Sequence, residues 1–196
     1  MIRQLRPALV MFILLVFITG GIYPMVVTGI AQAAFPHAAN GSLLVRKSTL
    51  IGSALIGQAF SDPRYFQGRP SMTAGSPYSA LDLQGLSGSA ASNLGPLSQN
   101  LVDSVRERAE QLRAADPANQ PLIPADLVTA SASGLDPHIS VAAARYQVPR
   151  VAAARGLSEP AVQALVDQYT EGRLFGFLGE PRVNVLLLNL ALDGIK

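Results

Sequence analysis

The feature that most constrains this chain is a long uncharged stretch near its amino terminus. Arg6 and Arg46 bound it, and no aspartate, glutamate, lysine or arginine lies between them. Residues 7–30 are almost wholly apolar, and a helix of that length, rising about 1.5 Å per residue, would cover the roughly 30 Å hydrocarbon core of a bilayer. We therefore expect a transmembrane helix over about residues 7–30 within an amino-terminal segment of residues 1–34, followed by a tether at residues 35–41.

Glycine and proline residues inside the expected span indicate that it packs against another helix. Pro7 should lie in the first turn, where a helix needs no amide donor. Gly20, Gly21 and Pro24 should loosen or kink the helix, which a membrane helix tolerates when a neighbouring helix packs at that point. Small residues at Gly20, Gly21 and Gly29 would let that neighbour approach closely. We therefore expect a helical partner in the membrane.

The distribution of basic residues predicts the orientation of the span. Arg3 and Arg6 precede it, whereas the nearest basic residues beyond it are Arg46 and Lys47. Because basic residues that flank a span are retained in the cytoplasm, the amino terminus should be cytoplasmic and the rest of the chain extracytoplasmic.

A cleaved signal peptide is the competing interpretation of the same stretch. Arg3 and Arg6 make a basic start, and the Ala-Gln-Ala of residues 31–33 has the small-x-small form of a cleavage site. The apolar region, however, extends well beyond the roughly 7–15 residues of a signal-peptide core. An uncleaved anchor is favoured, and a secreted binding module released at Ala33 stays open as an alternative.

Residues 42–196 are expected to form one mixed α+β domain. Two β-rich runs flank residues 46–48 and predict a hairpin. Residues 61–96 are rich in glycine, proline and serine and follow neither a helical nor a strand period. A structureless loop of this length inside a compact domain is usually functional.

Two further elements carry apolar periodicity. An amphipathic helix should begin at Ser98 or Asn100 and end before Pro117. Residues 183–192 carry no charge and have apolar side chains at helical spacing, but their β-branched start also permits a strand. The absence of charge predicts that this last element is buried.

Short helices are predicted between these two elements. The pentapeptide Val-Ala-Ala-Ala-Arg occurs twice, and we expect one short helix for each copy, the second opened by Pro149 and stopped by Gly156. A third helix should run from Ser158, as its cap, to Tyr169, with Pro160 in its first turn.

Composition argues against several classes of function. The formal net charge is only +2 and the basic residues are scattered, so nucleic acid is not an expected partner. Without cysteine, neither a disulfide framework nor a thiolate metal site can form. The two histidines, His37 and His138, lie far apart in the sequence, so no metal site is expected, although a site made of carboxylates alone stays open.

The stretch DLVTASASGLDPHIS, residues 126–140, contains the residue types of a catalytic triad. Asp136 lies two residues from His138, and serines lie on both sides of them. None of these serines, however, occupies a G-x-S-x-G elbow. A membrane-anchored extracytoplasmic serine hydrolase that uses Ser133 or Ser140 with His138 stays open as an alternative function.

A structural role explains more residues of this stretch. Gly134 would supply a positive φ, Asp136 would cap the turn, and Pro137 would fix the turn or open a helix. Ser140 would cap the following helix, and the hydroxyls of residues 129–133 can bond nearby amides. We therefore interpret residues 126–140 as a scaffold and expect no catalytic residue in it.

Six motifs in a fixed order, after a single amino-terminal span, carry a resemblance to a known family. They are GSALIGQAF (52–60), YFQGRPS (65–71), SNLGP (92–96), DLVTASASGLDPHIS (126–140), RVAAAR (150–155) and LGEPRVNVLLLNLAL (178–192). Together they closely resemble the C subunit of bacterial Kdp potassium-transporting ATPases, and the resemblance covers nearly the whole chain.

This resemblance implies a small accessory subunit of the bacterial inner membrane. Its partners would be a channel-like subunit that binds potassium and a P-type ATPase subunit, besides membrane lipid. The subunit would be required for assembly and would act as a catalytic chaperone that raises the affinity of the ATPase subunit for ATP. It would hold no covalently bound cofactor, and ATP is implied only through the partner.

The sequence agrees with a role that depends on partners. It contains neither the Asp-Lys-Thr-Gly motif of P-type phosphorylation nor a Thr-Val-Gly-Tyr-Gly potassium filter. Because the charge distribution puts the domain outside, we expect it over the external mouth of the potassium-conducting subunit, with an indirect effect on ATP affinity. The residues that we expect to contact partners or to shape loops are Arg69, Asn93, Gly95, Gly134, Asp136 and His138.

Overall fold

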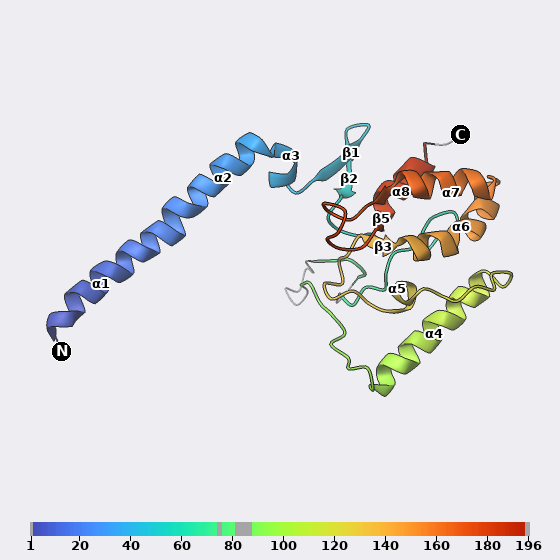
Figure 1. The fold of residues 1–196 in the computed structure, drawn as a ribbon, viewed down its shortest axis with the longest axis horizontal. Coiled ribbons are helices and arrows are strands. Elements are labelled where there is room, and N and C mark those ends of the chain that lie inside the picture. The colour runs from blue at the N-terminus through green and yellow to red at the C-terminus, as the bar shows by residue number, and fades with distance from the viewer. Residues whose placement is uncertain (1, 74–75, 81–87, 195–196) are drawn as a thin grey trace. The chain divides into compact units, whose positions relative to one another are not determined.

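The computed structural model of this chain describes residues 2–73, 76–80 and 88–194. The chain divides into two compact units, Met1–Ser53 and Ala54–Lys196, and each is described by itself (Figure 1). The hairpin that the sequence assigns to a domain beginning at residue 42 is grouped with the first unit.

The first unit begins with the expected long apolar helix. It consists of α1 (Ile2–Phe17), the π-helix η1 (Ile18–Ile22) and α2 (Tyr23–Ala34). The apolar part, Arg3–Ala34, is 32 residues long and none of it is buried, so its length of about 48 Å exceeds the hydrocarbon core of a bilayer. The expectation that Pro7 lies in the first turn is wrong, because the helix begins at Ile2 and Pro7 lies inside it.

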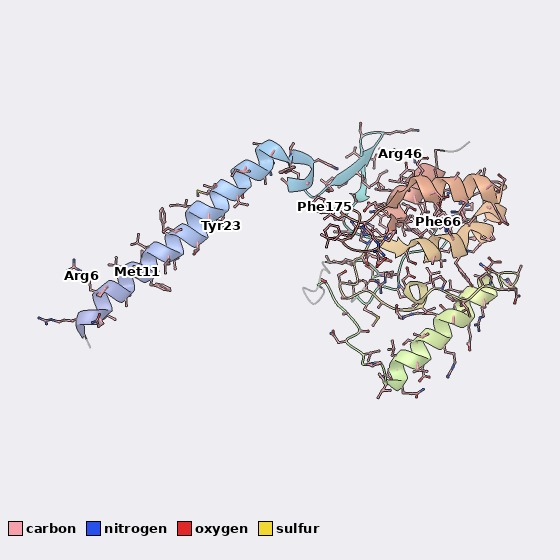
Figure 2. The ribbon with its side chains drawn as sticks, in the orientation of Figure 1. Arg6, Met11, Tyr23, Arg46, Phe66 and Phe175 are labelled. Carbon is pink, nitrogen blue, oxygen red and sulfur yellow. The ribbon has the colours of Figure 1, made fainter. Side chains whose placement is uncertain are left out.

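The expected loosening around the paired glycines is present as the π-helix. The Tyr23 N–H donates to the carbonyl oxygen of Ile18, five residues earlier. Pro24 has no N–H, and in a regular α-helix its ring would press against the carbonyl of Gly20. One wider turn relieves that contact, and the absence of Cβ atoms at Gly20 and Gly21 makes the turn easier to form. Tyr23 points away from the helix axis in Figure 2.

A short helix and a hairpin follow the span. Part of the predicted tether is a one-turn helix, α3 (Pro36–Ala39), rather than an extended link, and the Asn40 side chain donates 2.7 Å to the Pro36 carbonyl. The predicted hairpin is confirmed as strands β1 (Leu43–Arg46) and β2 (Thr49–Ser53). The two residues between them, Lys47 and Ser48, have φ values of 49° and 64°, the left-handed backbone that tight hairpin turns require.

The second unit mixes helices with a small antiparallel sheet. Its elements are α4 (Gln99–Ala115), α5 (Ala125–Val128), β3 (His138–Ser140), α6 (Val141–Arg155), α7 (Glu159–Gln168), β4 (Thr170–Glu171), β5 (Arg182–Asn184) and α8 (Val185–Leu192). The sheet has the order β3-β5-β4, and Val183 of β5 lies opposite both Ile139 and Thr170. The expected mixture of α and β elements is confirmed.

The prediction of two short helices in residues 141–155 is wrong. These residues form the single helix α6, which contains Pro149. Proline removes one intrahelical hydrogen bond, but buried side chains on both sides of it, Val148, Val151 and Ala152, hold the helix against the core and outweigh that local loss. The end at Gly156, with a φ of 67°, is as predicted.

The remaining helix predictions are largely confirmed. Helix α4 begins after Ser98 and ends before Pro117, and α7 begins after Ser158, although neither serine side chain makes a capping bond. The ambiguous apolar run contains a strand and a helix, because Asn184 ends β5 and accepts the Leu187 N–H at 3.1 Å as the cap of α8. Val183 and most of α8 are buried, as expected.

The core of the second unit includes one residue from the long glycine- and proline-rich loop. The helices and the sheet contribute Leu127, Ile139, Val151, Val162, Val166, Val183, Leu188 and Leu192, among others. Phe66 of the loop is fully buried among them, and Figure 2 labels it within the second unit. The described residues of the loop form neither helix nor strand, as predicted; residues 74–75 and 81–87 of it lie outside the described part of the chain.

Two buried amide side chains replace a sheet partner for the segment around Phe66. Asn189 of α8 accepts the Phe66 N–H and donates to its carbonyl, both at 2.9 Å. Gln147 of α6 does the same for Gln67, at 2.8 and 3.1 Å. Each amide is only 2% exposed. Because a buried main-chain polar group must be satisfied, these two side chains determine the path of the loop.

Two arginines of α6 bind the carbonyls just before Phe66. Arg150 donates to the oxygens of Pro63 and Tyr65 at 2.6 and 3.0 Å, and Arg155 donates to that of Arg64 at 2.7 Å. Burial lowers the pKa of Arg150. Residues 63–67, which we call the strap, are thus held at every carbonyl by a side chain of α6 or α8.

Candidate functional site

Three of the residues singled out from the sequence form one cluster. Arg69 Nη1 lies 3.5 Å from Asp136 Oδ2, and its Nη2 donates to the carbonyl of Ala130 at 3.0 Å. The Asp136 carboxylate also accepts the main-chain N–H of His138 at 3.0 Å, and the imidazole Nδ1 lies 3.4 Å from the same oxygen. Arg69 lies two residues after the strap, so the contacts that fix the strap also constrain the main chain at Arg69.

The pKa of Asp136 is determined by opposing effects. Partial burial raises the pKa, whereas hydrogen bonds from the side chain and main chain of His138 and the positive charge of Arg69 lower it. The bonds and the charge outweigh burial, so the pKa lies below its usual value of 3.8. Asp136 is therefore an ionised carboxylate at neutral pH and a poor proton donor.

The small sheet brings a second carboxylate to the other side of the imidazole. His138 Nε2 lies 3.9 Å from Glu171 Oε1, and Arg182 donates to the other oxygen of Glu171 at 3.0 Å. These residues come from three different strands, β3, β4 and β5. From Arg69 to Arg182 the side chains thus follow in the order guanidinium, carboxylate, imidazole, carboxylate, guanidinium.

The turn that carries Asp136 is shaped by hydroxyl groups. Gly134 has a φ of 67°, as expected, and its N–H donates to Ser131 Oγ at 2.9 Å. Ser133 Oγ accepts the Leu135 N–H at 3.1 Å, and Ser71 donates to the Gly134 carbonyl at 2.7 Å. A Cβ at Gly134 would lie 2.6 Å from a main-chain oxygen, so a larger residue would be excluded by contact as well as by backbone conformation.

The serines near His138 have partners other than its imidazole. Ser140 Oγ donates to Asp126 at 3.1 Å and accepts the Ala143 N–H at 3.0 Å, so it caps α6 as expected. The ring nitrogens of His138 face Asp136 and Glu171. Among the described contacts, no serine hydroxyl reaches the imidazole, and the geometry offers no nucleophile activated by it. Pro137 opens no helix, because β3 follows it directly.

Tyr78 closes the cluster on another side. Its hydroxyl donates to the carbonyl of Arg69. A Cβ at Gly57 would lie 2.3 Å from its ring, and one at Gly68 would lie 2.5 Å from its hydroxyl oxygen. Burial, assisted by the negative charge of Asp136, raises the pKa of Tyr78 to about 12. The phenol therefore stays protonated and holds the main chain that positions Arg69.

An open depression of about 630 Å³ lies beside this cluster, and its lining combines apolar and charged groups. Ile56, Leu135 and Pro137 supply the apolar part, and Arg69, Asp136 and His138 supply the charged part. Within the described residues, no group of three or more histidine, aspartate or glutamate side chains could hold a metal ion. The arrangement suits the recognition of a surface better than the enclosure of a small substrate.

The two other candidate residues lie in the last part of the long loop. Asn93 has a φ of 51°, and Gly95 accepts the Ser98 N–H at 3.0 Å just before α4. None of the described hydrogen bonds or ion pairs links either residue to Arg69, Asp136 or His138. Contact of any of the six residues with a partner stays a prediction.

Comparison with known proteins identifies the family. Residues 5–194 match the profile of the KdpC family, described as the c chain of the K+-transporting ATPase. The chain belongs to the KdpC family. It is therefore a subunit of a potassium-transporting ATPase complex, and the resemblance seen in the six motifs is confirmed.

Relatives named as KdpC subunits match along the whole length. The potassium-transporting ATPase KdpC subunit of Dechloromonas aromatica is 59% identical over 192 residues, which are 98% of this chain and 97% of the relative. That of Sorangium cellulosum is 57% identical over 196 residues and covers 100% of both chains. That of Variovorax paradoxus is 59% identical over 189 residues, 96% of this chain and 95% of the relative. For a KdpC-family subunit of a membrane transporter, the apolar helix Arg3–Ala34 fits a single-pass anchor.

Sequence reasoning missed several residues of the cluster and its support. Asn189 and Gln147 are polar residues inside apolar helical runs, and that interruption was a signal of a buried hydrogen-bonding role. Glu171 and Tyr78 gave no comparable signal, because their neighbours in the sequence do not show which residues they approach.

Proposed function

We propose that this chain is the non-catalytic accessory subunit of an ATP-driven potassium uptake complex. It would be held in the bacterial inner membrane by one helix, with its amino terminus in the cytoplasm and residues 54–196 outside. It would bind the potassium-conducting subunit and the P-type ATPase subunit and would be required for their assembly. It would also raise the affinity of the ATPase subunit for ATP.

The observation that carries this proposal is the match to the KdpC family over residues 5–194, nearly the whole chain. The site is consistent with it. The Arg69–Asp136–His138 cluster places the imidazole between two carboxylates, and among the described contacts it activates no serine hydroxyl.

The extracytoplasmic placement is supported by the charge distribution. Arg3 and Arg6 lie at the amino-terminal end of the apolar helix, and the next charged residue is Arg46. Basic residues near a span favour the cytoplasmic side. An effect on ATP affinity from outside would then be indirect, through stabilisation of the conformation of the ATPase subunit that binds ATP more tightly.

Assembly and ATP affinity can be tested in the purified complex. The other subunits, carrying the affinity tag, are purified with and without this chain, and potassium-stimulated ATP hydrolysis is measured against ATP concentration. Omission of the chain should reduce recovery of the intact complex, and KM for ATP should rise by about fivefold or more. An intact complex with unchanged KM would contradict the proposal.

Orientation can be tested with single cysteines, because the chain contains none of its own. Leu122→Cys lies at a position that is 92% exposed in the second unit, and Arg3→Cys lies at the amino-terminal end of the apolar helix. A membrane-impermeant maleimide added to intact spheroplasts should label Leu122→Cys and leave Arg3→Cys unlabelled until the membrane is opened. The reverse pattern would overturn the placement.

A further inference from the structure

Four large apolar side chains are exposed within five consecutive residues of the second unit. Leu174, Phe175, Phe177 and Leu178 have 62%, 79%, 69% and 48% of their surface exposed. They form the reversal between β4 and β5, and we call residues 174–178 the apolar tip. Figure 2 shows Phe175 at the periphery, in contrast to Phe66 in the interior. A contiguous exposed apolar group of this kind is characteristic of an interaction site.

The apolar tip is held in one shape by its own main chain. The N–H groups of Leu174 and Leu178 each donate to the other's carbonyl at 2.9 Å, and Gly176 donates to the carbonyl of Arg173 at 3.1 Å. An ion pair between Arg173 and Glu180, 2.7 Å long, joins the two sides of its base. Such preorganisation reduces the entropy lost when the tip enters a shaped pocket.

The backbone conformation at Phe175 is unfavourable for the aromatic residue that occupies it. Its φ is 54°, a left-handed conformation that is unfavourable for a bulky aromatic residue and easier for asparagine or glycine. The exposed ring adds no packing that could offset this strain. A residue that is unfavourable in the free chain is more readily explained by a contact with another molecule.

Charge around the apolar tip favours a protein over a lipid surface as its partner. Residues 174–179 carry no charge. Next to them, Arg173 pairs with Glu180 and Arg182 with Glu171, so the four neighbouring charges cancel. Binding to an anionic bilayer relies on a surplus of basic residues, which this surface lacks. An apolar centre within a neutral polar rim is instead the arrangement of a protein–protein contact.

We propose that the apolar tip is an anchor by which this chain docks into an apolar, uncharged pocket on another subunit of the potassium-transporting ATPase. The inference rests on the proposed accessory function, and it identifies the apolar tip as a surface by which this chain binds the other subunits during assembly. Phe175 and Phe177 enter the pocket, and the paired charges of Arg173 and Glu180 lie at its rim.

The test compares the full-length chain with a tip variant in the assembled complex. Phe175→Asn and Phe177→Ser are combined, since asparagine keeps the left-handed backbone favourable and both rings are exposed. Leu97→Ser and Leu122→Ser, at positions 97% and 92% exposed, form the matched control. Each chain is co-expressed with the other subunits, one of which carries an affinity tag, and is quantified after purification in mild detergent.

We expect the control to be recovered at the wild-type level and the tip variant to fall by about tenfold or more, with the thermal unfolding midpoints of the isolated chains unchanged. Recovery of the tip variant at the wild-type level would overturn the inference while leaving the accessory function intact. If the wild-type chain itself were not recovered with the other subunits, the accessory function would fail and the inference with it.

A second measurement separates protein from lipid and does not depend on the variant's recovery. Phe177→Cys is labelled with an environment-sensitive fluorophore, and the chain is placed in nanodiscs of phosphatidylethanolamine and phosphatidylglycerol. We expect a blue shift only after addition of the complex that lacks this subunit. A blue shift in the nanodiscs alone that spin-labelled lipid quenches, or none with the complex, would overturn the proposal.

Discussion

At the scale of single residues, two buried amide side chains make the main-chain hydrogen bonds that a neighbouring strand would make in a sheet. Asn189 binds both main-chain polar groups of Phe66, and Gln147 binds both of Gln67. These bonds fix the position of the end of the strap, two residues before Arg69.

Replacement of one amide should be strongly destabilising. Asn189→Leu keeps the approximate volume but leaves the buried N–H and carbonyl of Phe66 without partners. We expect the free energy of unfolding to fall by about 2–4 kcal/mol, measured by urea unfolding of the full chain in detergent. Gln111→Leu, at an exposed helical position, should change it by no more than about 0.5 kcal/mol; equal effects of the two would refute the role given to Asn189.

The lowered pKa of Asp136 predicts that its contribution to folding stability depends on pH. Because this pKa is lowered in the folded chain from 3.8, ionised Asp136 contributes stability above the unfolded value, and the contribution is lost as pH falls through the folded value. Asp136→Asn should therefore lower the urea midpoint at neutral pH. The difference from wild type should shrink as pH falls below about 4.

The matched control for this pH dependence is an exposed carboxylate. Asp103→Asn removes a surface ion pair with Arg106, and such pairs contribute little. It should leave the urea midpoint close to wild type over the same pH range. A deficit of Asp136→Asn that stayed constant down to about pH 3 would show that its effect is not electrostatic.

At the scale of elements, packing keeps α6 continuous although it contains a proline, a residue that usually interrupts a helix. Pro149 interrupts its hydrogen bonds, yet Val148, Val151 and Ala152 bury the same helix in the core. The continuity of α6 matters for the site, because Gln147, Arg150 and Arg155 must face the strap together.

Replacement of Pro149 should stabilise the second unit. Pro149→Ala restores an amide donor in the interior of α6, and we expect the free energy of unfolding to rise by about 1–3 kcal/mol, measured by urea unfolding. Pro160→Ala is the control, since Pro160 lies in the first turn of α7, where no donor is missing. A destabilised Pro149→Ala chain would mean that the ring itself is needed for packing.

At the scale of the whole molecule, the core belongs entirely to the second unit. All of its members lie between Phe60 and Leu192, whereas no described residue of the apolar span is buried. The span and the hairpin therefore contribute no side chain to that core, and the second unit contains the contacts that should stabilise it.

A fragment of residues 54–196 should fold without the membrane helix. We expect a cooperative urea transition with a midpoint close to that of the full chain in detergent, followed by far-UV circular dichroism. A fragment of residues 68–196 is the control. It lacks Phe66, which is fully buried, and the rest of the strap, and it should show no cooperative transition. Equal behaviour of both fragments would mean that the strap is dispensable.

Elements with local causes were predictable from the sequence. The apolar helix followed from length and composition, the hairpin from β-rich runs, and α4 from its apolar period. The left-handed Gly134 and the cap at Ser140 were also predictable, because each is determined within three residues. Residues 141–155 were divided wrongly because the burial that keeps α6 continuous is not a local property.

What the sequence determined by itself was the presence of a long apolar helix that fits a membrane anchor, the type of most elements and the family, since hydrophobic length, backbone preference and ordered motifs are properties of consecutive residues. What only the tertiary structure decided was which distant groups meet. Asn189 meets Phe66, Glu171 meets His138, and the strap lies between α6 and α8. The physical reason is that these pairings form only when a shared core brings remote segments together and requires each buried polar group to find a partner.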